Sequence, residues 1–307
     1  MKKSIALLLT ITMVFVFTPS AFAGEDDSPL ISGKSEIVKG ATEILDSTSN
    51  TQTITVSEKE IVSKMIKDGS MTRETLNKQL EDLSNQSEKK LQQNGYNNQQ
   101  IEVIRNYEKG EDAFDYVFNS NARAGATLTF RYGLAGTNTR KSVLLAYEMI
   151  WSSCPLTTFT DSFGVGWIAA NKNSIPLATK TDSATGAVEY YTVDGQYMNY
   201  HRTISMKSPE SGVITGNPII GRASGGYGKH IGGAAKISTQ SDSSNLDTIQ
   251  VFVSYAHSKV TVETFFNVTI EWKKMSTAIR FMPRLNQSIV AEGHHTFKYN
   301  NNDIVEA

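Results

Sequence analysis

The chain has 307 residues, of which 39% are hydrophobic, with a net charge of −1 and a single cysteine. This length allows one large or two moderate domains, and a single cysteine excludes a disulfide framework within the chain. Residues 24–123 hold 18 acidic and 12 basic side chains and residues 124–307 hold 13 and 16, so neither part has the strongly basic balance of a nucleic-acid-binding protein.

The first residues have the pattern of a secretory signal peptide. Lys2 and Lys3 precede an uncharged, mostly apolar run at residues 5–17, and Ala-Phe-Ala at residues 21–23 has the spacing of a cleavage site. At about 1.5 Å per residue the apolar run is too short to cross a hydrocarbon core of roughly 30 Å. We therefore expect residues 1–23 to be removed, the mature protein to begin at Gly24, and the product to be secreted and extracellular.

A leader and a helical region are expected next. Residues 24–55 are polar, rich in Ser, Thr, Gly and acids, and show no sustained period, which predicts a flexible leader. Residues 56–122 predict helices, the first with Ser57 and Glu60 at the spacing of a capping box. The second is expected to begin after Ser70 or Thr72 and to end at Gly95, with an apolar stripe of Leu76, Leu80, Leu83 and Leu91. We interpret the region as a packing or linking subdomain, with a partner-binding coiled coil as the alternative.

Short alternating runs of Val, Ile, Thr and aromatic residues replace the helical pattern after a break at residues 119–126. The clearest strand pattern, at residues 259–273, is expected to pair with residues 248–258 in a long hairpin. The chain therefore predicts an α+β fold in which a small helical region precedes an antiparallel β-sandwich-like domain at residues 123–290, followed by a polar tail at residues 291–307. The charge difference and the composition of the break predict that the β domain folds independently.

The glycine-rich segment GRASGGYGKHIGGAAK, residues 221–236, raises the question of a phosphate-binding loop. Such a loop needs glycines at defined spacing between a strand and a helix N-terminus, and neither the spacing nor a following helix pattern is present. We expect instead that the glycines let two strands bend or pass closely, or that they form a surface loop in which Lys229 and His230 are solvated.

Glu148 is the acid with the most unusual position. It shares one face of a predicted strand with Leu144 and Ala146, while larger apolar residues take the other face. If both faces are covered, burial raises the pKa of this carboxyl unless Arg131 or Arg140 pairs with it. We favour a structural ion pair over a catalytic role.

Other reactive side chains predict no site. Cys154 lacks a catalytic signature and is expected to be buried and inert. The adjacent His294 and His295 point to opposite faces of an extended chain, which does not suit a shared metal. Glu263 and Glu271 share a strand face but lie roughly 26 Å apart, too far for a glycosidase pair. We predict no catalytic residue, no metal and no cofactor.

Three segments carry a resemblance: NGYNNQQIEVIRNYEKG, GATLTFRYGLAG and WSSCP, which together span roughly the middle third of the chain. With them the chain resembles a type of secreted protein of Gram-positive bacteria to which no activity is attached. The resemblance implies export and a helical region followed by a β region, and it carries no catalytic positions across.

We expect a secreted, non-catalytic protein that binds an extracellular partner, namely an envelope polymer, a glycan or a protein, through its β domain. Exposed aromatic rings would supply the stacking surface, although each ring could equally fill the core. The alternative is a membrane-active toxin or bacteriocin-like protein that inserts the hairpin at residues 248–273. The candidate binding residues are Trp167, Tyr190, Tyr191, Tyr197 and Tyr200.

Overall fold

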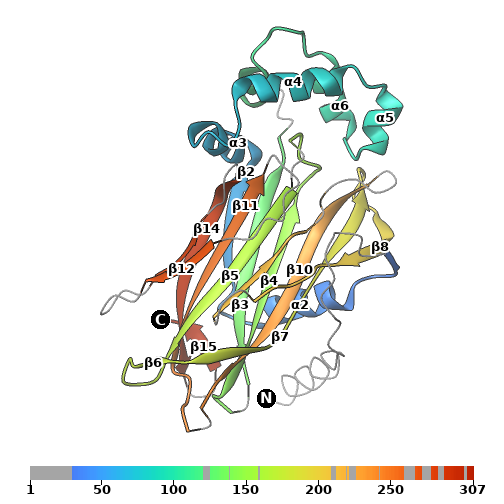
Figure 1. Ribbon diagram of the computed structural model, residues 1–307. Coiled ribbons are helices and arrows are strands. Elements are labelled where there is room, and N and C mark those ends of the chain that lie inside the picture. Colours follow the sequence, from blue (N-terminus) through green and yellow to red (C-terminus); the bar gives the residue numbers. More distant parts are fainter. Residues whose placement is uncertain are drawn as a thin grey trace.

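A computed structural model shows the arrangement of the chain (Figure 1). It describes residues 30–307 except 120–124, 138, 158–159, 209–211, 219, 221–225, 242, 259–266, 272–277, 283–286 and 301–302. The predicted signal peptide and cleavage site lie outside the described residues.

Two large antiparallel sheets face each other and enclose the core (Figure 1). Sheet A contains β1 (Ile31–Ser32), β2 (Gln52–Ser57), β3 (Thr127–Gly136), β4 (Ser142–Trp151), β7 (Thr179–Thr192), β8 (Tyr197–Thr203) and β10 (Gly226–Thr239), in the order β1-β8-β7-β10-β4-β3-β2. Sheet B contains β5 (Thr160–Ala170), β6 (Pro176–Leu177), β9 (Val213–Gly216), β11 (Thr248–Ser258), β14 (Gln287–Asn300) and β15 (Asp303–Glu306), in the order β15-β14-β11-β5-β6 with β9 also paired to β5. The predicted α+β class with a β-sandwich-like domain is confirmed.

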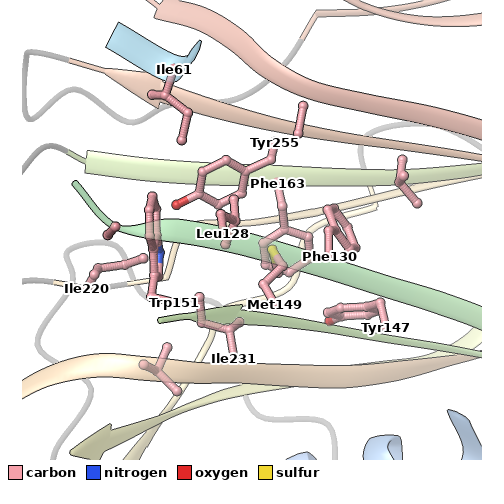
Figure 2. Packing of buried hydrophobic residues seen from close by; sticks show 14 of the residues in the cluster. Ile61, Leu128, Phe130, Tyr147, Met149, Trp151, Phe163, Ile220, Ile231 and Tyr255 are labelled. Carbon is pink, nitrogen blue, oxygen red and sulfur yellow. The ribbon is translucent and has the colours of Figure 1, made fainter. Parts of the chain in front are cut away.

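Alternation along the strands divides the two faces of sheet A. On β3 and β4, Phe130 lies opposite Met149 and both side chains are buried toward sheet B, where they pack in one core with Phe163 and Tyr255 (Figure 2). Each large apolar side chain buried in this way contributes about 1.5–3 kcal/mol to stability. The opposite parity of the same strands carries Glu148 to the outer face, so the site described below lies outside the core.

Helices occupy one end of the sandwich, and another helix lies along the outer face of sheet A (Figure 1). The end helices are α3 (Glu58–Lys67), α4 (Arg73–Ser84), α5 (Glu88–Gln93), α6 (Asn98–Arg105) and the π-helical turn η1 (Asp115–Asn119). The capping box of Ser57 and Glu60 begins α3, as predicted. Within the described part of the chain, no helix combines the length and the apolar character needed to span a bilayer.

The second predicted helix is in fact two helices. It begins with Thr72 as its N-cap, as expected, but α4 ends at Ser84 rather than continuing to Gly95. The hydroxyl of Ser87 then accepts a hydrogen bond from the backbone N–H of Lys90 and caps the separate helix α5. The leucine spacing continues across the break and hides this internal cap in the sequence. The four stripe leucines are all buried.

The prediction of a flexible leader at residues 24–55 was wrong for its described part. Residues 36–47 form helix α2 (Glu36–Ser47), which Ser35 caps, and β2 pairs with β3 at the edge of sheet A. The apolar residues of α2 are few but lie on one face, and that face is buried against sheet A: Val38, Ala41, Ile44 and Leu45. Because the segment is otherwise polar, these few apolar residues did not indicate the periodicity of a helix in the sequence.

The prediction of a polar tail at residues 291–307 was also wrong. β14 runs to Asn300 and pairs with β11, and β15 extends sheet B beyond it. The side-chain amide of Asn50 donates hydrogen bonds of 2.8 Å to the carbonyl oxygens of Leu134 and Ile304. It thereby joins β3 of sheet A to β15 of sheet B.

The predicted hairpin at residues 248–273 does not form. β11 is a central strand whose two edges are taken by β5 and β14. The described part of the next segment, β12 (Asn267–Glu271), pairs with β13 (Ala278–Met282) in a separate two-stranded sheet. Period-2 alternation identifies a strand but does not say which strand it pairs with. The prediction that this strand pairs with the next segment of the chain was wrong. The membrane-insertion alternative loses the element on which it was based.

A single core crosses the predicted domain boundary, whose residues 120–124 lie outside the described part. Ile61 of α3 and Leu80 of α4 belong to the same buried cluster as Phe130 and Trp151. Glu58, at the start of α3, accepts hydrogen bonds from the backbone N–H groups of Ala126 and Thr157, each 2.8 Å long. The helices are thus attached to the β region by apolar packing and by a buried carboxylate.

Candidate functional site

Polar side chains collect on the outer face of sheet A, between the sheet and α2. They come from neighbouring strands: Arg131 of β3 lies directly opposite Glu148 of β4, and Glu189 of β7 directly opposite His230 of β10. Helix α2 approaches closely because β10 has a glycine beneath it. A Cβ atom on Gly232 would lie only 3.2 Å from the Cα atom of Val38.

Glu148 is fully buried and receives donors from three elements. One carboxylate oxygen pairs with the guanidinium of Arg131, and the other lies 2.8 Å from the Thr42 hydroxyl and 3.1 Å from Nε2 of His230. Burial opposes ionisation of this carboxyl, but the hydrogen bonds from His230 and Thr42 and the charges of His230 and Arg131 hold its pKa below the ordinary value of 4.5. The predicted structural pair of Glu148 with Arg131 is confirmed. Arg140 instead lies over the ring of Tyr299.

Glu189 is the second carboxylate of the cluster, and no motif in the sequence marks it. Its two oxygens accept hydrogen bonds of 3.0 Å from the backbone N–H of Ser35 and from the Tyr191 hydroxyl. Nδ1 of His230 lies 3.9 Å from the same carboxylate, so this imidazole stands between two buried acids. Burial and the nearby Glu189 charge raise the pKa of Tyr191, which therefore keeps its proton and acts as the donor.

This cluster fastens α2 to sheet A. Thr42 and Ser35 bind the two buried acids, and Asp46 near the end of α2 lies 2.7 Å from the Arg131 guanidinium. Each buried charge has a partner of opposite sign or several hydrogen bonds, which is the condition for burying charge at tolerable cost. Glu148, Glu189 and His230 are therefore residues that position the helix.

The described part of the glycine-rich segment, residues 226–236, lies within strand β10. A Cβ atom on Gly233 would overlap the carbonyl oxygen of Thr185 and the hydroxyl of Tyr147. The glycine therefore lets two strands pass closely, which was the first of the two expectations. The other expectation, a loop with a solvated His230, was wrong, because this side chain is 17% exposed and contacts Glu148.

Two of the five predicted binding aromatics fill the core. Trp167 is 2% exposed and its Nε1 donates a 3.0 Å hydrogen bond to the Thr179 hydroxyl; Tyr190 is fully buried. Their predicted role as exposed stacking surface was wrong, because both lie on the inner faces of their sheets. Tyr200 is half-buried, and its ring lies 5.2 Å from that of Tyr190.

The two remaining candidates, Tyr191 and Tyr197, stand together and are half-buried. Their ring centroids are 5.5 Å apart in an edge-to-face arrangement. The ammonium of Lys229 lies 5.5 Å from the Tyr191 ring centroid and that of Lys34 lies 5.9 Å from the Tyr197 ring centroid. We call these four side chains the tyrosine–lysine patch. Lys34 lies in the segment predicted to be a flexible leader, so its contribution was not expected.

The tyrosine hydroxyls of the patch point into the protein. Tyr191 donates to buried Glu189, and Tyr197 donates to the carbonyl oxygen of Gly33, which also lies 2.8 Å from Nδ1 of His201. Burial together with the Glu189 charge raises the pKa of Tyr197 to about 12. Each hydroxyl thereby anchors its ring, and both side chains remain half-buried, with part of their surface toward solvent.

The other reactive side chains lie apart from this region. Cys154 is buried in the core, as expected, with its sulfur 3.7 Å from the carbonyl oxygen of Asn94. His294 stacks on Phe252, whereas His295 lies 3.2 Å from a carboxylate oxygen of Glu306, so the two imidazoles do lie on opposite faces of β14. Among the residues that the structure describes, no group of three or more His, Cys, Asp or Glu side chains could hold a metal ion.

No protein-family model matches the chain, and no curated protein matches it. Among solved structures it is similar to the KRT10-binding region domain of the pneumococcal serine-rich repeat protein PsrP, over 44% of this chain and 79% of that one, with 10% identity and a TM-score of 0.22. It is also similar to AvmM, described as catalysing macrocyclization in Alchivemycin A biosynthesis, over 57% of this chain and 88% of that one, with 6% identity and a TM-score of 0.22. Likeness at this level carries no argument about what this chain does.

Proposed function

We propose that the protein is a secreted, non-catalytic binding protein that holds an extracellular partner on the outer face of sheet A. The observation that carries the proposal is the tyrosine–lysine patch, in which side chains from β7, β8, β10 and the segment before α2 converge. Secretion is supported by the signal-peptide pattern of residues 1–23. The partner class is an envelope polymer, a glycan or a protein.

The patch has the properties of a preformed binding surface. Its rings are anchored through their hydroxyls, so a ligand that packs against them does not have to order two flexible side chains. Tyrosine supplies a large contact area with few rotatable bonds, which is why it is common at protein binding surfaces. Glu189 of the buried cluster accepts the hydrogen bond that anchors Tyr191.

Cosedimentation of the mature protein with purified cell walls tests the proposal. We expect wild-type protein to pellet saturably and Tyr197→Leu to bind about tenfold more weakly, a loss of roughly 1.4 kcal/mol. Tyr116→Leu is the matched control, because Tyr116 is also half-buried and also donates its hydroxyl to a backbone carbonyl, but it lies in the end region. Wild-type protein that stays in the supernatant, or equal losses in the two variants, would contradict the proposed function.

A further inference from the structure

Resting on the proposed function, we infer that the ligand of the tyrosine–lysine patch is an acidic polysaccharide, with its anionic groups on Lys34 and Lys229 and a sugar ring against Tyr191 and Tyr197. The contacts and charges around the patch support this ligand class in three steps.

The two lysines are cations available for a ligand. Within the described part of the chain, neither ammonium has a carboxylate oxygen within 4.0 Å. Other cations are paired: Lys109 lies 2.7 Å from Glu81, and Arg73 lies 2.6 Å from Asp112. Lys34 and Lys229 instead lie over aromatic rings, which orient an ammonium without neutralising its charge.

The turn beside Lys229 presents backbone rather than a side chain to the ammonium. The turn from β7 to β8 contains Gly195 with a φ of +77°, a backbone conformation that side-chain-bearing residues rarely adopt. A Cβ atom at this position would lie 3.8 Å from the Lys229 ammonium, so the ammonium lies beside bare backbone. The buried Glu189 beneath the patch keeps its charge but is not ion-paired with either lysine, and its oxygens accept hydrogen bonds from Ser35 and Tyr191.

The chemistry of the patch matches a sugar acid more closely than the other polyanions. The carbon edges and faces of two inclined rings suit the C–H groups of a pyranose, and the flanking ammoniums suit carboxylates on either side. A nucleic acid would require a broad basic surface, whereas the protein has a net charge of −1. An acidic peptide has the charge but not the C–H face, and it is included as an outcome of the test.

The test compares a charged polysaccharide with a neutral one and with a charged polypeptide. Affinity electrophoresis is run in gels with carboxymethyl-dextran, with neutral dextran and with polyglutamate. We expect retardation in carboxymethyl-dextran, at least tenfold weaker binding to neutral dextran and to polyglutamate, and loss of binding as salt increases. The double variant Lys34→Gln/Lys229→Gln should bind carboxymethyl-dextran at least tenfold more weakly. Lys172→Gln, an exposed lysine in the turn before β6 of sheet B, should bind as wild type does.

The outcomes separate the inference from the proposed function. Wild-type protein that binds cell walls but treats charged and neutral dextran alike overturns the acidic-polysaccharide inference alone, as does a double variant that binds normally with an unchanged melting temperature. Preferential binding to polyglutamate replaces the polysaccharide with an acidic peptide. Failure to bind cell walls and all three polymers overturns both.

Asp194→Asn, in the turn beside Lys229, should strengthen binding to carboxymethyl-dextran, because it removes the exposed carboxylate nearest in sequence to Gly195.

Discussion

Glu148 shows how one side chain can join three elements of a fold. Its carboxylate receives Arg131 from β3, His230 from β10 and Thr42 from α2, all on the outer face of sheet A. The exposed side of this arrangement is small, since Glu148 is fully buried and its three partners are only partly exposed. These partners stabilise the buried charge of Glu148, and the charge in turn fixes the positions of the three partner side chains.

Replacement of Glu148 by glutamine should therefore destabilise the protein. The variant keeps the side-chain volume but leaves Arg131 with only the exposed Asp46 and His230 with only a more distant acid, which costs on the order of 3 kcal/mol for a largely buried pair. Urea unfolding at neutral pH measures the loss. Glu36→Gln is the control: Glu36 forms an exposed pair with Lys39, and its loss should change stability by about 0.5 kcal/mol or less. Equal effects of the two substitutions would show that Glu148 is not a central residue.

Acid should weaken the fold through the same residue. The pKa of Glu148 in the folded protein lies below 4.5, so its contribution is present in full above that pH and is lost as the pH falls through the lowered value. We expect the melting temperature of wild-type protein to fall more steeply below about pH 4.5 than that of Glu148→Gln. Parallel pH profiles for the two proteins would contradict this assignment.

At the scale of the element, strand β10 requires a glycine at one position, whereas helix α2 contains a glycine that its packing does not require. Gly233 lies against Thr185 and Tyr147 with no room for a methyl group, whereas a Cβ atom on Gly40, inside α2, would meet no neighbouring atom within 4 Å. The first glycine permits close packing of strands, and the second leaves a helix position that a better helix former could occupy.

Alanine at these two glycines should change stability in opposite directions. Gly233→Ala forces a strand apart from its neighbour and should destabilise by about 1–3 kcal/mol, the range for overpacking. Gly40→Ala should stabilise by roughly 0.5–1 kcal/mol, because alanine loses less backbone entropy in a helix. Thermal unfolding of both variants checks the pair. Destabilisation by Gly40→Ala would show that this position of α2 is not open as described.

The elements also show which features a sequence can supply. The capping box of Ser57 and Glu60 could be predicted because both residues lie in one short segment. The ion pair of Glu148 with Arg131 could be predicted because an acid within an apolar strand needs a cation as its partner. The partners Glu189 and His230 could not be predicted, because they come together only through the pairing of β7 with β10. Strand pairing over long distances is not encoded in the alternation of one strand, which is also why β11 was given the wrong partner.

At the scale of the whole molecule, the chain does not divide at residue 123 as the charge pattern predicted. The β region shares its core with α3 and α4, and sheet A takes its edge strand β2 from residues before the boundary. Helix α2 covers the outer face of the same sheet. Removal of the first part would expose one edge, one face and one end of the sandwich at once.

A fragment that begins at Ala124 should therefore fail to fold as the intact chain does. Without α2, the buried acids Glu148 and Glu189 lose Thr42 and Ser35, and without α3 the core loses Ile61. We expect the fragment to show no cooperative thermal transition, in contrast to the full mature protein. A sharp transition in the isolated fragment, seen by circular dichroism, would instead establish an independent β domain.

The bridge made by Asn50 also has a consequence for the order of folding. Its amide joins carbonyl groups that lie 84 and 254 positions further along the chain, so the bridge cannot close before β15 has been synthesised. Contacts of such long range slow folding, because the ends of a long loop must meet before any energy is gained. The bridge is therefore one of the last contacts that a chain synthesised from its N-terminus can make, and it fastens the two sheets only after the strands of both are present.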